Sequence, residues 1–86
     1  MFKQTFTVKN PTGLHARPAS QLVHLCKNFT EEIYIIVGTN KVNPKSIISI
    51  LSAGIKSGTP LTIQVTGKNE DAVGKQLINF LDNLAE

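Results

Sequence analysis

The sequence has a single cysteine, no tryptophan, and no long hydrophobic run. Cys26 cannot form an internal disulfide, which is typical of a protein that works in a reducing compartment. No apolar run approaches the roughly 20 residues that a bilayer span requires. Residues 1–9 alternate apolar and polar side chains and lack the basic and apolar blocks of a signal peptide. We therefore expect a cytoplasmic protein without membrane insertion.

Charge is also sparse. Charged residues make up 17% of the chain, and the formal net charge is +3. Most basic residues lie between Lys3 and Lys56, where acidic residues are few, but they form no cluster. Nucleic acid would require a basic stripe or aromatic side chains stacked on an open face. The pattern therefore argues against nucleic-acid binding and favours an acidic protein partner.

The length of 86 residues, with 41% hydrophobic residues, allows one compact core. A chain this short buries only about 60 to 65 per cent of the surface that it exposes when unfolded. We expect residues 1–86 to form a single domain.

Two periodicities follow one another along the chain. Alternating apolar and polar residues predict strands, and apolar residues spaced three and four apart predict helices with one buried face. The predicted strands cover residues 2–8, 33–37, 40–43 and 61–66; the predicted helices cover 16–27, 46–53 with Ser46 as N-cap, and a final stretch capped by Asn69 whose apolar stripe reaches Leu84. The order βαββαβα predicts an α+β fold with helices on one face of a largely antiparallel sheet.

The most informative stretch runs from Gly13 to Ser20 and reads GLHARPAS. His15 lies at the expected N-cap of the first helix, where unpaired N–H groups and about half a positive charge favour an anion. Pro18 fits the first turn without removing a needed donor, and the guanidinium of Arg17 matches phosphate oxygens. We interpret His15 as a nucleophile that accepts a phosphoryl group, with Arg17 stabilising that group.

No second catalytic group accompanies this histidine. The neighbouring sequence has no carboxylate, second base or metal-binding cluster. This favours a carrier that hands phosphate on over an enzyme that turns over by itself, and no cofactor is implied. From the residues alone, a surface or capping histidine without function is an equally open alternative.

Two stretches resemble the signatures of a known family. Residues 13–19 resemble the active-site signature of HPr, the phosphocarrier family of the bacterial phosphoenolpyruvate-dependent sugar phosphotransferase system, and residues 45–54 (KSIISILSAG) resemble its second signature. The resemblance covers the whole chain and implies an open-faced β-sandwich, in which three helices cover one face of a four-stranded antiparallel sheet. It further implies that His15 accepts phosphate from enzyme I and passes it to IIA domains of sugar permeases, assisted by Arg17.

The second signature surrounds Ser46, which the resemblance implies as a site of regulatory phosphorylation. An HPr serine kinase/phosphorylase and a catabolite-control transcription regulator are the partners implied for that modification. A phosphate on Ser46 would lie at a helix N-terminus, where the fold tolerates it.

The resemblance also implies an exposed apolar docking patch beside the histidine, formed by Ile47, Ile48 and Leu51, whereas Ile50 is expected in the core. An exposed apolar patch usually marks a binding site. Further partner-facing residues are expected on the wetter face of the first helix: Ala16, Ser20, His24 and Lys27.

Three alternatives are disfavoured. A metal site using His15, His24 and Cys26 fails because nine helical residues rise about 13 Å, too far for one ion. Lys45-Ser46 lacks the preceding glycine of a nucleotide-binding loop. A purely regulatory HPr paralogue would lack the active histidine, which this chain keeps. We expect a monomer.

Overall fold

The structure is a computed structural model that describes residues 1–85. Its elements are β1 (Phe2–Thr7), α1 (Ala16–Cys26), β2 (Glu32–Val37), β3 (Asn40–Val42), α2 (Ile47–Ala53), β4 (Pro60–Thr66) and α3 (Glu70–Asp82). This order confirms the predicted βαββαβα arrangement, with most strand and helix ends within one residue of the prediction and α3 ending two residues before Leu84. Within residues 1–85 no helix combines the length and the apolar character needed to span a bilayer.

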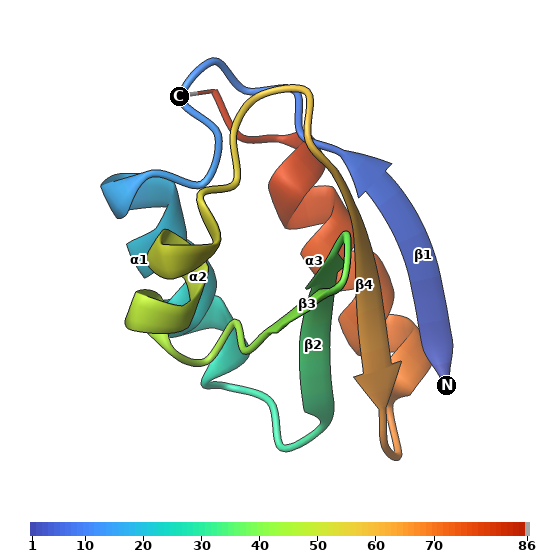
Figure 1. The fold of residues 1–86 in the computed structure, drawn as a ribbon. Coiled ribbons are helices and arrows are strands. Elements are labelled where there is room, and N and C mark those ends of the chain that lie inside the picture. The colour runs from blue at the N-terminus through green and yellow to red at the C-terminus, as the bar shows by residue number, and fades with distance from the viewer. Residues whose placement is uncertain (86) are drawn as a thin grey trace.

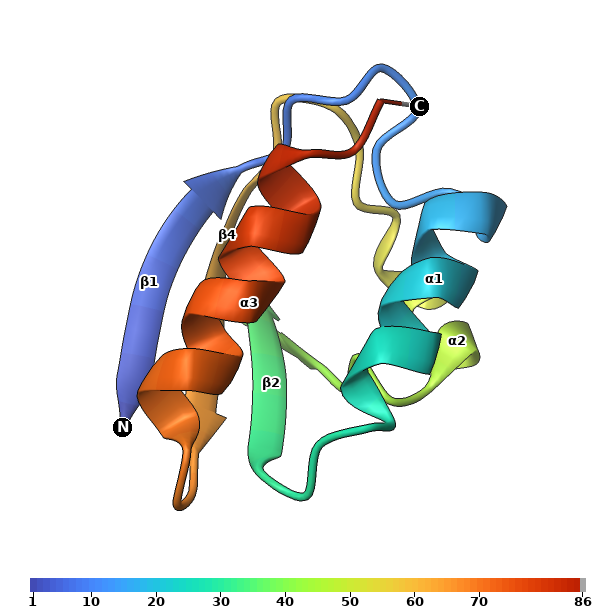
Figure 2. The same ribbon diagram turned by 180° about the vertical axis from the view of Figure 1, so that it is seen from behind.

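The four strands form one antiparallel sheet in the order β1-β4-β2-β3. Because β4 lies between β1 and β2, Val65 pairs with Phe2 on one side and with Ile33 on the other. Figures 1 and 2 show the three helices on one side of the sheet, with α3 running along β1 and β4. The predicted fold class, an open-faced sandwich with one covered sheet face, is therefore confirmed.

The core lies between the sheet and the helices, and the expected apolar stripes supply it. In α1, Ala19, Leu22 and Cys26 are buried, and Val23 is half-buried. Of the stripe predicted for the last helix, three residues are buried, whereas Phe80 and Leu84, which lies just beyond the end of α3, are half-buried and pack against the core. The fully buried large side chains include Leu22, Ile35, Ile50, Leu61, Ile63, Leu77 and Leu81. Helices and sheet thus share one continuous core.

The start of α3 differs from the prediction in one detail. Asn69 occupies the N-cap position, but its side chain makes no capping hydrogen bond. Two glutamate side chains accept hydrogen bonds from backbone N–H groups of this turn. The backbone N–H of Asn69 donates to a carboxylate oxygen of Glu31 (3.2 Å), and that of Gly67 donates to Glu70 (3.3 Å). The expected capping by the Asn69 side chain was wrong: the backbone of Asn69 (φ −113°, ψ 35°) lacks the extended conformation typical of a capping residue.

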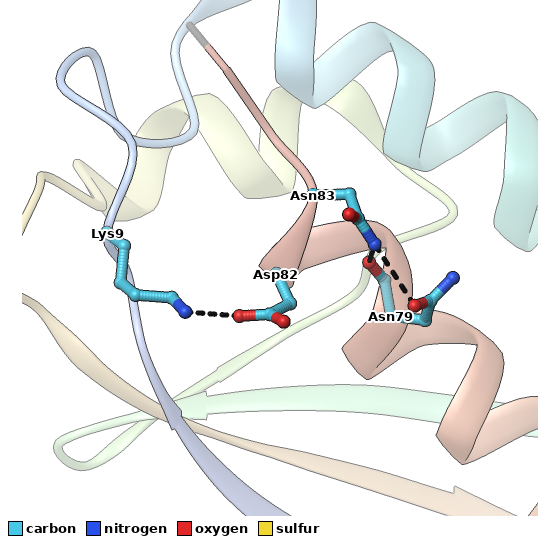
Figure 3. A network of polar contacts seen from close by, with 4 residues as sticks. All are labelled: Lys9, Asn79, Asp82 and Asn83. Atoms are coloured by element: carbon cyan, nitrogen blue, oxygen red, sulfur yellow. Dashed lines mark hydrogen bonds and ion pairs between the residues drawn. The ribbon is translucent and has the colours of Figure 1, made fainter.

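The end of α3 is tied to the segment that follows β1 (Figure 3). Lys9 forms an ion pair with Asp82, and the side-chain amide of Asn83 donates to the carbonyl oxygen (2.7 Å) and the side-chain oxygen (3.0 Å) of Asn79. The ion pair is half exposed and contributes little to stability. The ion pair instead connects the end of α3 to the loop that carries His15, because Lys9 lies at the start of that loop.

Gly74 lets α3 approach β1 closely. A Cβ at this position would overlap the ring of Phe2. We expect Gly74→Ala to lower the free energy of unfolding by about 1 to 3 kcal/mol, because overpacking outweighs the roughly 1 kcal/mol by which alanine is the better helix former. Urea unfolding would measure this change. In a Phe2→Ala background the same substitution should stabilise the protein. If Gly74→Ala stabilises both backgrounds, the close contact is absent.

Candidate functional site

The loop that carries His15 is closed by hydrogen bonds around a turn. The amide of Asn10 donates to the carbonyl of Gly13 (2.7 Å), and the backbone N–H of Gly13 donates back to the carbonyl of Asn10 (3.1 Å). Gly13 has a φ of 62°, a conformation that suits glycine. Leu14, only 2% exposed, anchors the loop in the core. The predicted turn chemistry of residues 10–13 is confirmed.

Gly13 also lies directly against the segment that follows α2. A Cβ on Gly13 would lie 2.5 Å from the carbonyl oxygen of Ile55 and 2.8 Å from the Cα of Lys56. The backbone N–H of Leu14 donates to the same Ile55 carbonyl (3.0 Å). The two segments therefore meet backbone against backbone, which requires glycine at position 13.

His15 stands at the N-cap of α1, as the sequence predicts. Its backbone is extended (φ −76°, ψ −172°), and its carbonyl accepts the first helical hydrogen bond, from the N–H of Ala19 (2.8 Å). The imidazole makes no capping hydrogen bond, and the residue is exposed. Arg17 is also exposed, whereas Pro18 and Ala19 are buried. The first turn is thus fixed by its buried side, while His15 faces solvent.

Ser46 is the N-cap of α2, also as predicted. Its hydroxyl accepts a hydrogen bond from the N–H of Ser49 (3.3 Å), and the Ser49 hydroxyl accepts one from the N–H of Asn43 (2.9 Å). Gly54 ends the helix with a φ of 61°. The short helix is therefore defined at both ends by residues that the sequence identifies.

The apolar patch on α2 is exposed as expected. Ile47, Ile48 and Leu51 are 38%, 74% and 44% exposed, whereas Ile50 is fully buried. α1 lies beside α2 (Figures 1 and 2). The partner-facing residues predicted on α1 are exposed as well: Ala16, Ser20, His24 and Lys27.

Lys45 is a structural residue that sequence reasoning did not single out. Its ammonium donates to the carbonyl oxygens of Phe29 (2.8 Å) and Glu31 (2.9 Å). These carbonyls belong to the loop after α1, so Lys45 ties that loop to the start of α2. A lysine directly before a helix cap carries no sequence signal for such a role, because its partners are backbone atoms distant in the chain.

The disfavoured metal alternative gains no support. Cys26 is fully buried, whereas His15 and His24 are exposed. Across residues 1–85, no three histidine, cysteine, aspartate or glutamate side chains form a group that could hold a metal ion.

An open groove of about 300 Å³ lies between β3 and α2. It is lined by Asn40, Lys41, Val42, Ser49, Ser52 and Ala53. None of the predicted site residues is among them, so this groove is separate from the candidate site.

The fold and the site define a small α+β protein that presents an exposed histidine at a helix N-terminus beside a short helix with an apolar surface. The family model described as the PTS HPr component phosphorylation site matches residues 2–83. The chain belongs to the HPr family.

Two curated relatives show its place in that family. The phosphocarrier protein HPr of Lysinibacillus sphaericus is 37% identical over 84 residues, covering 98% of this chain and 96% of the relative. The HPr-like protein Crh of Halalkalibacterium halodurans is 39% identical over 82 residues, covering 95% and 98%. Both the carrier and the HPr-like branch are thus similar to this chain.

Solved structures of HPr proteins are also similar to this chain. HPr-C-His from Thermoanaerobacter tengcongensis superposes with a TM-score of 0.91 at 35% identity, covering 95% of this chain and 92% of that one. An HPr dimer from the same organism superposes with a TM-score of 0.74 at 35% identity, covering 95% and 94%.

The buried thiol yields a test of the core. Burial raises the pKa of Cys26 from 9.0 to about 12, partly opposed by the nearby Lys45 charge. The folded thiol therefore stays protonated while an unfolded one ionises, so its contribution to stability, intact below pH 9, is lost as the pH rises toward 12. We expect iodoacetamide at about pH 8 to label the protein in urea but not in buffer. Equal labelling in both would show that Cys26 is accessible.

Proposed function

We propose that this protein is a phosphocarrier of the sugar phosphotransferase system and that His15 carries the phosphoryl group. The observation that supports this most is the exposed imidazole of His15 at the N-cap of α1, with the Arg17 residue two positions on. Residues 1–86 act as one HPr domain in the cytoplasm, where phosphoenolpyruvate and enzyme I are found.

The transfer step forms one P–N bond and breaks another. A ring nitrogen of neutral His15 attacks the phosphorus of a phosphohistidine on enzyme I, and the new P–N bond forms as the old one breaks, its electron pair returning to the donor imidazole. In a second step of the same kind, the phosphoryl group passes from His15 to a histidine of an IIA domain. Arg17 stabilises the charge on the phosphoryl oxygens. Because the sequence next to His15 and Arg17 supplies no carboxylate or second base, the protein acts as a carrier and not as an independent enzyme.

The docking surface combines apolar and basic residues. Ile47, Ile48 and Leu51 supply exposed apolar area, and Lys27 and Arg17 add positive charge. An acidic partner with an apolar centre fits this surface. Ala16, Ser20 and His24 lie on the same helix as these cations and contact the same partners. Enzyme I and the IIA domains bind this surface in turn.

Ser46 regulates the carrier. Phosphorylation by an HPr serine kinase/phosphorylase places about two negative charges beside the apolar patch, which repels an acidic partner. The same phosphate offers a recognition mark to a catabolite-control transcription regulator, which links sugar transport to carbon catabolite regulation.

A purely regulatory role is the second candidate, because identity to the HPr-like protein Crh is 39%, similar to that with HPr. In that role the protein acts through phosphorylated Ser46 alone. The presence of His15 favours the carrier. We also propose a monomer as the working state, although an HPr relative forms a dimer.

The carrier role predicts phosphorylation at one histidine. We expect incubation with phosphoenolpyruvate and purified enzyme I to produce an acid-labile phosphate that is abolished in His15→Ala. His24→Ala is the matched control, because it removes the other histidine from the same helix and should retain the phosphate. If the unchanged protein acquires no phosphate, the carrier role fails and the regulatory candidate is favoured.

The regulatory role predicts that charge at Ser46 matters more than charge elsewhere on α2. We expect Ser46→Asp to slow transfer from enzyme I about tenfold, the effect of roughly 1.4 kcal/mol, with an unchanged melting temperature because aspartate is a good N-cap. Ser52→Asp adds the same charge near the other end of α2 and should slow transfer less. Equal slowing would indicate a general charge effect without a specific role for Ser46.

A further inference from the structure

The loop that carries His15 has a lysine beside it that neither signature stretch contains. The Cα of Lys56 would lie 2.8 Å from a Cβ on Gly13, and Gly13 is two residues before His15. Figures 1 and 2 both show the segment after α2 running alongside the loop before α1. Lys56 is therefore next to the His15 loop in space although it is distant in sequence.

The backbone around Lys56 is held in place on both sides. Its N–H donates to the hydroxyl of Thr59 (3.1 Å), and its carbonyl accepts from the N–H of Thr59 (3.1 Å). Gly58 and Thr59 in turn hydrogen-bond to the backbone of Val8, at 2.7 and 3.0 Å. The point from which the Lys56 side chain starts is thus fixed relative to the His15 loop.

The side chain is long enough to reach a phosphoryl group on His15. Two residues of chain span at most about 7 Å, so the Cα atoms of Lys56 and His15 lie within about 12 Å of each other. A lysine places its ammonium about 6 Å from its Cα, and a phosphorylated imidazole extends a similar distance. Both residues are exposed. Within the described chain, the ion pairs involve Lys9 and the N-terminus and leave the Lys56 ammonium uncommitted.

We propose that Lys56 is a second cationic catalytic residue, which contacts the phosphoryl oxygens on His15 together with Arg17. This inference rests on the proposed carrier function. Lys56 forms and breaks no covalent bond; it offsets the negative charge of the phosphoryl group while the P–N bond is exchanged. A cation supplied from the segment after α2 also makes the stability of the phosphorylated state depend on the position of α2.

The test compares three variants for the rate of phosphorylation by enzyme I and phosphoenolpyruvate. Lys56→Gln removes the charge and is expected to slow transfer about fivefold to tenfold. Lys56→Arg keeps the charge and is expected to stay within about twofold of the unchanged protein. Lys68→Gln is the matched control, since Lys68 is also exposed but lies in the turn between β4 and α3, at the opposite end of the sheet (Figure 1).

Measurements at low and high salt separate local contact from long-range attraction of the partner. A contact with the phosphoryl group persists at high salt, whereas steering between exposed charges is screened. The proposal is overturned if Lys56→Gln transfers at the normal rate, if Lys68→Gln is slowed as much, or if the deficit disappears at high salt. Failure of the carrier function itself looks different, because then the unchanged protein acquires no phosphate on His15.

Discussion

The hydrogen bond from the backbone N–H of Leu14 to the carbonyl of Ile55 joins the two halves of the candidate site. It works only because Gly13 has no side chain, so that the loop before α1 lies directly on the segment after α2. Contact between two backbones leaves no rotamers through which the spacing could change. The position of His15 relative to α2 is therefore set by peptide geometry, which explains how two separate sequence signatures form one surface.

A second tie acts at the other ends of the same helices. Lys45, just before α2, donates to the carbonyls of Phe29 and Glu31, just after α1. The Leu14–Ile55 bond links the start of α1 to the end of α2, and Lys45 links the end of α1 to the start of α2. The helix pair is braced at both ends. A surface that is already ordered loses little conformational freedom when a partner binds, which suits the proposed role of binding and releasing two partners in succession.

Charge is distributed unevenly between the pair α1 and α2 and the third helix, α3. Neither α1 nor α2 contains an acidic residue, whereas Glu70, Asp71 and Asp82 all lie in α3. The two helices proposed for docking thus carry only positive or neutral side chains, whereas three acidic residues lie in α3 and two more, Glu31 and Glu32, lie just before and at the start of β2. This separation increases the attraction of an acidic partner to one side of the molecule even though the net charge is only +3.

The sequence by itself determined the element order, the apolar stripes of α1 and α3, and the caps at His15 and Ser46, because all of these depend on local spacing and on residue type. The exposure of Ile48 was expected only from the family resemblance. The sequence could not reveal that Gly74 accommodates Phe2, that Glu31 accepts a hydrogen bond from the backbone N–H of Asn69, or that Lys45 binds two carbonyls, because each involves atoms brought together only by folding. His15 could be identified as a candidate functional residue from the residues next to it in the sequence. That Ile55 and Lys56 lie beside the loop that carries His15 was decided by the tertiary structure alone, because backbone contacts between distant segments leave no pattern in the residues that make them.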